Sequence, residues 1–196
     1  MRKTHLKYHS ILISFLIVGS NMQTLSAATP GIYKNISEYK QGMPSQSLDS
    51  FSVRKIKYGF WGLTSKDRLT FQRLSIDAKA ARQMGKVFGF SDGEKLYVKT
   101  NKIRVFKISN FAQAESIGKY LYYIDIAYHF DSRLPFLWFS YRTERLIDKN
   151  SGKRIYLTVP FLKKLMAAKP ELLQSFKKEK NQSRKLKEYL EAFYVS

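Results

Sequence analysis

The chain has 196 residues, of which 44% are hydrophobic, 26% are charged and none is cysteine. This balance is that of a globular protein, and it argues against a collagen-like repeat, a disordered chain and a membrane protein with several spans. Without cysteine the chain has no disulfide, no thiolate metal site, no iron–sulfur cluster and no thiol nucleophile.

The first 28 residues have the three-part composition of a secretory signal peptide. Three basic residues precede an apolar run at positions 11–18, which is shorter than the roughly 20 residues of a membrane-spanning helix. Ser26 and Ala28 are small residues at the spacing of a signal peptidase site, so we expect cleavage after Ala28 and a periplasmic or secreted mature protein. An uncleaved N-terminal anchor is the alternative. We expect no transmembrane segment after cleavage, because no second apolar run of that length follows.

Most of the positive charge belongs to the mature chain. The formal net charge is +20, from 35 Lys and Arg against 15 Asp and Glu. The first 28 residues contain three of the basic residues and none of the acidic ones, so the mature chain keeps 32 basic residues against 15 acidic ones, a net charge of +17.

Segments typical of β-strands follow one another at close spacing from residue 31. The opening Gly31-Ile32-Tyr33 predicts a short strand or a turn of helix, followed by a loop to residue 47. Glycine-containing turns predict two hairpins, because glycine readily adopts positive φ angles. These hairpins span residues 87–98, around Asp92-Gly93, and residues 146–157, around 149–152. Further strands are predicted at residues 51–58, 69–76, 103–108, 120–130 and 136–142, and a helical turn at 77–84.

After residue 158 the apolar spacing changes to that of helices, with Pro170 in position to begin the second of three. We therefore predict a mainly β fold with C-terminal helices: an antiparallel barrel or sandwich of about seven or eight strands, followed by two or three short α-helices. The expected organisation is a signal peptide at 1–28, a β-rich domain at 29–158 and a C-terminal helical appendage at 159–196.

Four short motifs carry a family resemblance: Gly31-Ile32-Tyr33, Gly42-x-Pro44-Ser45, Val87-Phe-Gly-Phe-Ser-Asp-Gly93 with Leu96-Tyr97-Val98, and Pro170-Glu-Leu-Leu-x-x-Phe176. Together they resemble uncharacterised secreted proteins of Bacteroides-type bacteria, a family without an established activity. The resemblance implies an envelope location and a β-rich body, and it supplies no catalytic residue.

One small group of residues is compatible with catalysis. His129 is the single histidine after residue 28, and Asp125 and Asp131 flank it in the predicted strand at 120–130 and just beyond. No Gly-x-Ser-x-Gly segment accompanies them, so a Ser-His-Asp triad has no nucleophile context. One histidine with scattered carboxylates also disfavours a metal site, and the chain has no nucleotide-binding motif. We expect no metal and no cofactor.

Two groups of residues are candidates for binding. Arg54, Lys55 and Lys57 lie among strand residues in an exported basic protein, where anionic lipid, lipopolysaccharide and acidic glycans are the available polyanions. Export makes nucleic acid a poor candidate partner. In the predicted strand at 136–142 both faces are apolar, so the face that bears Phe139 and Tyr141 is a candidate lining for a cavity or an interface.

The sequence leaves three functional hypotheses open. We favour an exported, non-enzymatic envelope protein that binds an anionic surface or an envelope protein. The second is a hydrolase of envelope polymers that uses Asp125, His129 or Asp131. The third is a β-barrel that carries a small ligand in its lumen.

Overall fold

The computed structural model describes residues 28–58, 69–75, 85–100, 110–130 and 138–195. The expected signal sequence before residue 28, the helical turn at 77–84 and the strand at 103–108 lie outside the described residues.

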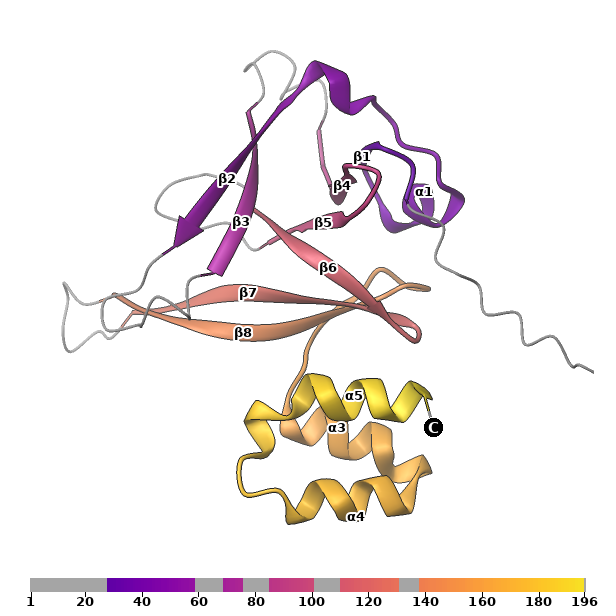
Figure 1. The fold of residues 1–196 in the computed structure, drawn as a ribbon, viewed down its shortest axis with the longest axis vertical. Helices are drawn as coiled ribbons and strands as arrows, with labels where there is room; N and C mark the ends of the chain where they lie inside the picture. Colours follow the sequence, from indigo (N-terminus) through magenta and orange to yellow (C-terminus); the bar gives the residue numbers. More distant parts are fainter. Residues whose placement is uncertain (1–27, 59–68, 76–84, 101–109, 131–137, 196) are drawn as a thin grey trace, which may run out of the picture.

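The fold is a mostly antiparallel sheet followed by C-terminal α-helices, as the sequence predicts (Figure 1). The described strands are β1 Gly31–Tyr33, β2 Ser52–Tyr58, β3 Leu69–Ser75, β4 Gly89–Ser91, β5 Leu96–Lys99, β6 Phe111–Ile117, β7 Tyr120–Phe130, β8 Trp138–Asp148 and β9 Arg154–Tyr156. The α-helices are α1 Ile36–Gln41, α3 Val159–Leu165, α4 Pro170–Lys178 and α5 Leu186–Val195. Short 3₁₀ helices are η1 Leu48–Ser50, η3 Met166–Ala168 and η4 Gln182–Arg184.

These strands form one open sheet. The hydrogen-bonded order is β1-β4-β5-β6-β7-β8-β9, and every pairing is antiparallel. The β2–β3 hairpin joins this path through a single pair of residues, Gln72 in β3 and Phe111 in β6. The longest pairing joins β7 and β8 over all 11 residues of each strand.

The two predicted hairpins are present. β4 and β5 flank a turn in which Gly93 has a φ of 97°, and the Asp92 carboxylate accepts hydrogen bonds from the amides of Glu94 and Lys95. In the β8–β9 turn Gly152 has a φ of 70°. There the Ser151 and Asn150 amides donate to Asp148 and lower the pKa of its carboxyl group.

Three details of the predicted secondary structure differ. The predicted strand at 136–142 and the first strand of the hairpin at 146–157 are one strand, β8. The loop predicted after residue 33 contains helix α1. Asn35 caps the N-terminus of this helix, and Gly42, in a left-handed conformation, caps its C-terminus. Strand β6 was not predicted at all, because its Ala, Gln and Glu residues have low strand propensity.

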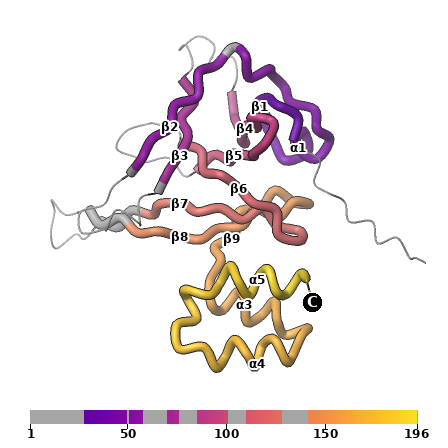
Figure 2. The backbone as a smooth tube through the Cα atoms, in the orientation of Figure 1, coloured from indigo at the N-terminus to yellow at the C-terminus, as the bar shows by residue number. Residues whose placement is uncertain are grey.

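The β7–β8 hairpin lies between two layers (Figures 1 and 2). The C-terminal helices cover one side of it, and the N-terminal strands lie on the other. The helix-side core consists of Ile117, Tyr120, Tyr122, Leu146, Leu157, Leu162, Met166, Phe176, Leu186, Tyr189 and Leu190. The core on the other side includes Phe71, Leu96, Val98, Ala112, Leu121, Tyr123, Ile126 and Ile147.

The helices are tied to the sheet by more than apolar contacts. The Thr158 hydroxyl accepts a hydrogen bond from the Phe161 amide and so caps α3 directly after β9. Lys187 of α5 forms an ion pair with Glu115 of β6 at 2.5 Å, and its ammonium group lies over the Tyr122 ring. None of the described helices has the length and hydrophobicity needed to cross a membrane.

A glycine in the β6–β7 turn is needed for the docking of α5. Gly118 has a φ of 53°, and a Cβ atom at this position would overlap the ring of Tyr194. Gly118→Ala should lower the free energy of unfolding by about 2–4 kcal/mol in a urea titration, because backbone strain and overpacking add. Gly85→Ala is the matched control: its φ is 68° with no neighbouring atom within 4 Å, so strain alone should cost about 1–2 kcal/mol. Equal losses at both positions would show that Tyr194 does not pack as described.

Candidate functional site

The β2–β3 hairpin is a two-stranded ribbon at the margin of the sheet. Its strands pair over seven residues each, whereas only the Gln72–Phe111 pair connects it to β6. Val53, Arg54, Lys55 and Lys57 of β2 are all exposed. Because neighbouring residues of a strand point to opposite faces, both faces of this strand are accessible to solvent.

The ribbon concentrates positive charge. Its two described strands contain Arg54, Lys55, Lys57 and Arg73 and no Asp or Glu. The register sets Arg54 directly opposite Arg73. Like charges in directly opposed positions destabilise a strand pair, so this pairing is not optimal for the stability of the ribbon.

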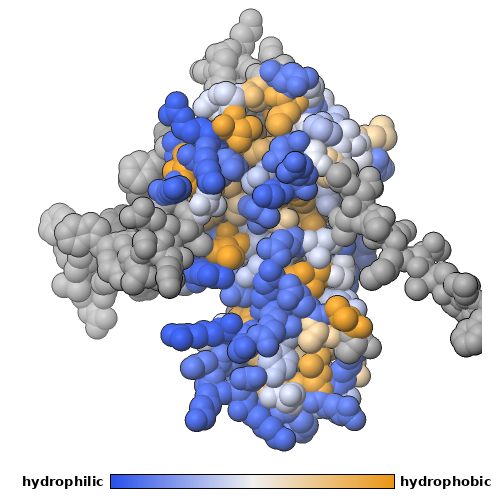
Figure 3. Space-filling view, viewed as in Figure 1, coloured by the Kyte–Doolittle hydropathy of each residue, from blue (hydrophilic) through white to orange (hydrophobic). Residues whose placement is uncertain are grey.

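The C-terminal helices also carry exposed basic residues, which contribute to the hydrophilic surface in the lower part of Figure 3. Lys177, Lys178 and Lys180 are exposed at the end of α4 and just after it. They differ from the basic residues of the ribbon in having Glu171, Glu179 and Glu188 on the same group of helices. The ribbon is therefore the more strongly cationic element per residue.

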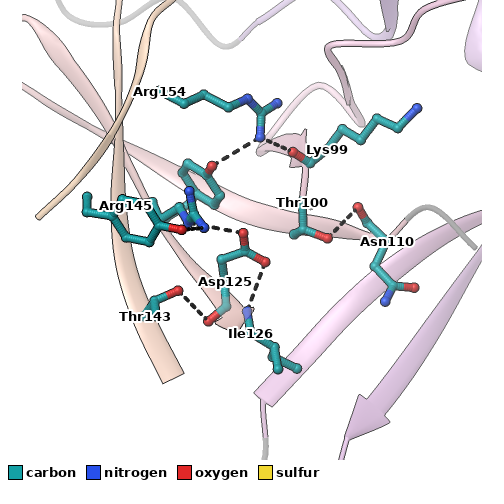
Figure 4. Close-up of polar contacts among 10 residues, drawn as sticks. Lys99, Thr100, Asn110, Asp125, Ile126, Thr143, Arg145 and Arg154 are labelled. Carbon is teal, nitrogen blue, oxygen red and sulfur yellow. Dashed lines mark hydrogen bonds and ion pairs between the residues drawn. The ribbon is translucent and has the colours of Figure 1, made fainter. Parts of the chain in front are cut away.

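Asp125, one of the candidate catalytic residues, forms a buried ion pair (Figure 4). Asp125 is 1% exposed, and its Oδ2 lies 3.2 Å from Nε of Arg145 on β8. The Nε–H is not directed at this oxygen, so the contact is ionic rather than a hydrogen bond. Arg145 Nη2 donates to the Tyr156 hydroxyl at 2.6 Å, and the guanidinium lies 3.7 Å from the centre of that ring.

A second arginine extends this polar cluster towards β5. Nη1 of Arg154 on β9 donates to the Lys99 carbonyl at 2.5 Å and to the Tyr123 hydroxyl at 3.0 Å (Figure 4). The cluster therefore joins β5, β7, β8 and β9 on the side of the sheet away from the helices. Within this cluster the buried carboxylate of Asp125 is paired with Arg145, which gives Asp125 a structural role.

Of the three candidate catalytic residues, Asp125 is the one whose side chain the structure describes. His129 belongs to β7 and pairs with Phe139 of β8, but their side chains lie outside the described residues, as does Asp131. In the described segments no group of three His, Asp or Glu residues is arranged to hold a metal ion.

Tyr141, the other predicted aromatic candidate, lies on a groove that the sequence did not reveal. The groove has a volume of about 1010 Å³ and runs between the edge of β8 and the beginnings of the C-terminal helices. Tyr141 is 54% exposed at its rim. The residues that line the groove are Tyr141, Arg142, Thr143, Glu144, Tyr156, Leu157, Thr158, Val159, Pro160, Ser183, Arg184 and Leu186.

Glu144 is the most unusual polar residue of the groove. Its Oε1 lies 3.8 Å from Nη2 of Arg142, whereas Oε2 is buried and has no hydrogen-bond partner among the described residues. Burial raises the pKa of this carboxyl group, and the charge of Arg142 opposes the rise. Burial likewise raises the pKa of Tyr122, which faces the same carboxylate.

Comparison of the chain with protein-family models, with curated proteins and with solved structures found no match in any of the three. The ribbon, the buried cluster and the groove are therefore the features of the molecule that bear on its function.

Proposed function

We propose that this is an exported, non-enzymatic envelope protein, of the secreted type that its motifs resemble, and that its β2–β3 ribbon binds a phosphate-bearing anionic surface. The observation that carries the proposal is the exposure of Arg54, Lys55 and Lys57 together on a ribbon whose two described strands contain no acidic residue. Anionic lipid headgroups and lipopolysaccharide phosphates are the matching surfaces of a bacterial envelope. Exposed lysines near an anionic membrane contribute about 1 kcal/mol each to binding.

Replacing Arg54, Lys55 and Lys57 together by Gln should weaken co-sedimentation with anionic vesicles on the order of 100-fold at 0.1 M salt, because three such contributions are lost. The free energy of unfolding should change by less than about 1 kcal/mol, because exposed charges contribute little to stability. Vesicles with and without lipopolysaccharide distinguish the two sources of phosphate.

The matched control replaces Lys177, Lys178 and Lys180 by Gln, which removes the same charge from exposed positions on the helices. This control should retain binding within a few-fold of the unaltered protein. An equal loss in both triple variants would mean that net charge alone drives binding. Aggregation of the ribbon variant with unchanged vesicle binding would instead assign the lysines to protection of an edge strand.

The proposed export predicts that the mature protein has a specific N-terminal residue. The Tyr33 hydroxyl donates to the Thr29 carbonyl at 2.5 Å, and the Ser91 hydroxyl donates to the Ala28 carbonyl at 2.9 Å. After cleavage behind Ala28 the Thr29 contact persists and can hold the new N-terminus against the sheet. N-terminal sequencing of protein recovered from the periplasm or medium should therefore begin at Thr29. A product that retains residues 11–18 would contradict cleavage and favour an anchored protein.

A further inference from the structure

Strand β9 pairs with only part of the edge of β8. Strand β9 pairs with Arg145, Leu146 and Ile147, whereas β8 continues back to Trp138. The Leu157 amide donates to the Glu144 carbonyl at 2.9 Å, which is the last contact of this row. Among the described strands none pairs with β8 beyond that point on the β9 side.

The direction of the unpaired backbone groups follows from that last hydrogen bond. In an antiparallel strand the N–H and C=O of one residue point to the same side, and successive residues alternate. Since the Glu144 carbonyl points towards β9, the N–H and C=O of Arg142 point to the same open edge. Arg142 lines the groove, so the groove presents strand-pairing groups as well as side chains.

The side chains of the groove suit one kind of occupant. Tyr141 and Tyr156, which are 54% and 52% exposed, line the groove, and Val159, Pro160 and Leu186 add apolar surface to it. A peptide strand alternates its side chains between two faces, so it can contact this lining while its backbone pairs with β8.

The charges of the groove select among extended peptides. Arg142 has a side chain that is 55% exposed, and Arg184 is exposed on η4. The single carboxylate of the lining, Glu144, is directed to Arg142 and is mostly buried. A second copy of β8 on this edge would bring two Arg142 residues close together in a protein of high positive charge. The exposed charges therefore favour an acidic partner over self-association.

We propose that the groove along the open edge of β8 binds an extended acidic segment of a partner protein by β-strand addition. This site is separate from the ribbon and does not depend on the proposed binding to an anionic surface. The partner's backbone continues the row begun by β9, and its acidic side chains lie near Arg142 and Arg184.

The test uses the full mature protein and end-blocked heptapeptides of alternating Val and Glu, with binding measured by calorimetry in the absence of lipid. Binding of this peptide is expected. The same peptide with N-methylated Val residues should bind at least about tenfold more weakly, because methylation removes backbone donors. The Val–Lys counterpart should also bind at least about tenfold more weakly, because Arg142 and Arg184 then repel it.

Protein variants locate the site. Arg184→Glu should weaken the Val–Glu peptide about tenfold, whereas Lys164→Glu, an exposed position of α3 outside the groove, should change it about twofold at most. The proposal is overturned if the Val–Glu peptide does not bind at millimolar concentration, or if its N-methylated form binds with equal affinity. It is also overturned if the protein forms a dimer in solution and the peptide does not inhibit dimer formation. Loss of vesicle binding in the ribbon variant has no effect on these outcomes, so the two proposals fail separately.

Discussion

Arg145→Met is expected to lower the free energy of unfolding by about 3–5 kcal/mol, because it leaves the buried Asp125 carboxylate without its counter-charge. The change also removes the hydrogen bond to Tyr156 and the contact of the guanidinium with that ring. The measurement is urea unfolding at pH 7, followed by far-UV circular dichroism. The effect should be among the largest for any single substitution in the protein.

Two controls identify the cause of this loss. Arg142→Met, three residues away on β8, removes an arginine whose side chain is 55% exposed and 3.8 Å from Glu144, and it should cost less than about 1 kcal/mol. The double variant Asp125→Leu with Arg145→Met should recover most of the stability, because no unpaired charge stays buried. A double variant as unstable as Arg145→Met would show that packing of the arginine, and not its charge, is what the fold needs.

Leu190→Ala should lower the free energy of unfolding by about 2–5 kcal/mol, because the deleted atoms leave a cavity between α5 and the sheet. Leu121→Ala, on the opposite side of β7, is the matched control and should cost a similar amount. Since helix and strand residues share the helix-side core, far-UV and near-UV circular dichroism should report one coincident unfolding transition for both variants.

A separate early transition in Leu190→Ala, in which helical signal disappears before aromatic packing, would contradict this expectation. The segment 159–196 would then be the independent appendage that the sequence suggests. Sequence periodicity identifies the apolar face of each helix but not the surface that the face covers. The tertiary contacts of Tyr120 and Tyr122 with this segment, together with the ion pair between Lys187 and Glu115, connect it to the sheet.

Elements of secondary structure with a clear local signal in the sequence were predicted correctly. The glycine turns located both hairpins, and the run of β-branched and aromatic residues gave β7 its observed bounds, Tyr120–Phe130. Strand β6 was not predicted, because its pairing with β5 and β7, rather than the strand propensity of its own residues, stabilises it as a strand. Its one local signal is the two-residue turn at Gly118 and Lys119.

The candidate sites divide in the same way. The basic residues of β2 are exposed, as expected of a strand rich in charged residues, and their role in binding stays a prediction. The environment of Asp125 depends on Arg145, which lies 20 positions later in the sequence, and alternation along β7 alone cannot show that both faces are covered. The groove beside β8 arises from the early end of β9 and from the position of η4, and neither has a local signature.

The most direct measurement of the ribbon's role uses the natural absence of cysteine. A polarity-sensitive fluorophore is attached to Thr70→Cys, an exposed position opposite Lys57, or to Gln174→Cys, an exposed position of α4. On addition of anionic vesicles the ribbon label should shift to the blue and the α4 label should not. The shift should vanish with neutral vesicles and diminish steeply with salt, since exposed charges are screened over about 10 Å at 0.1 M. A shift at Gln174→Cys alone, or one indifferent to lipid charge and salt, would contradict binding through the ribbon.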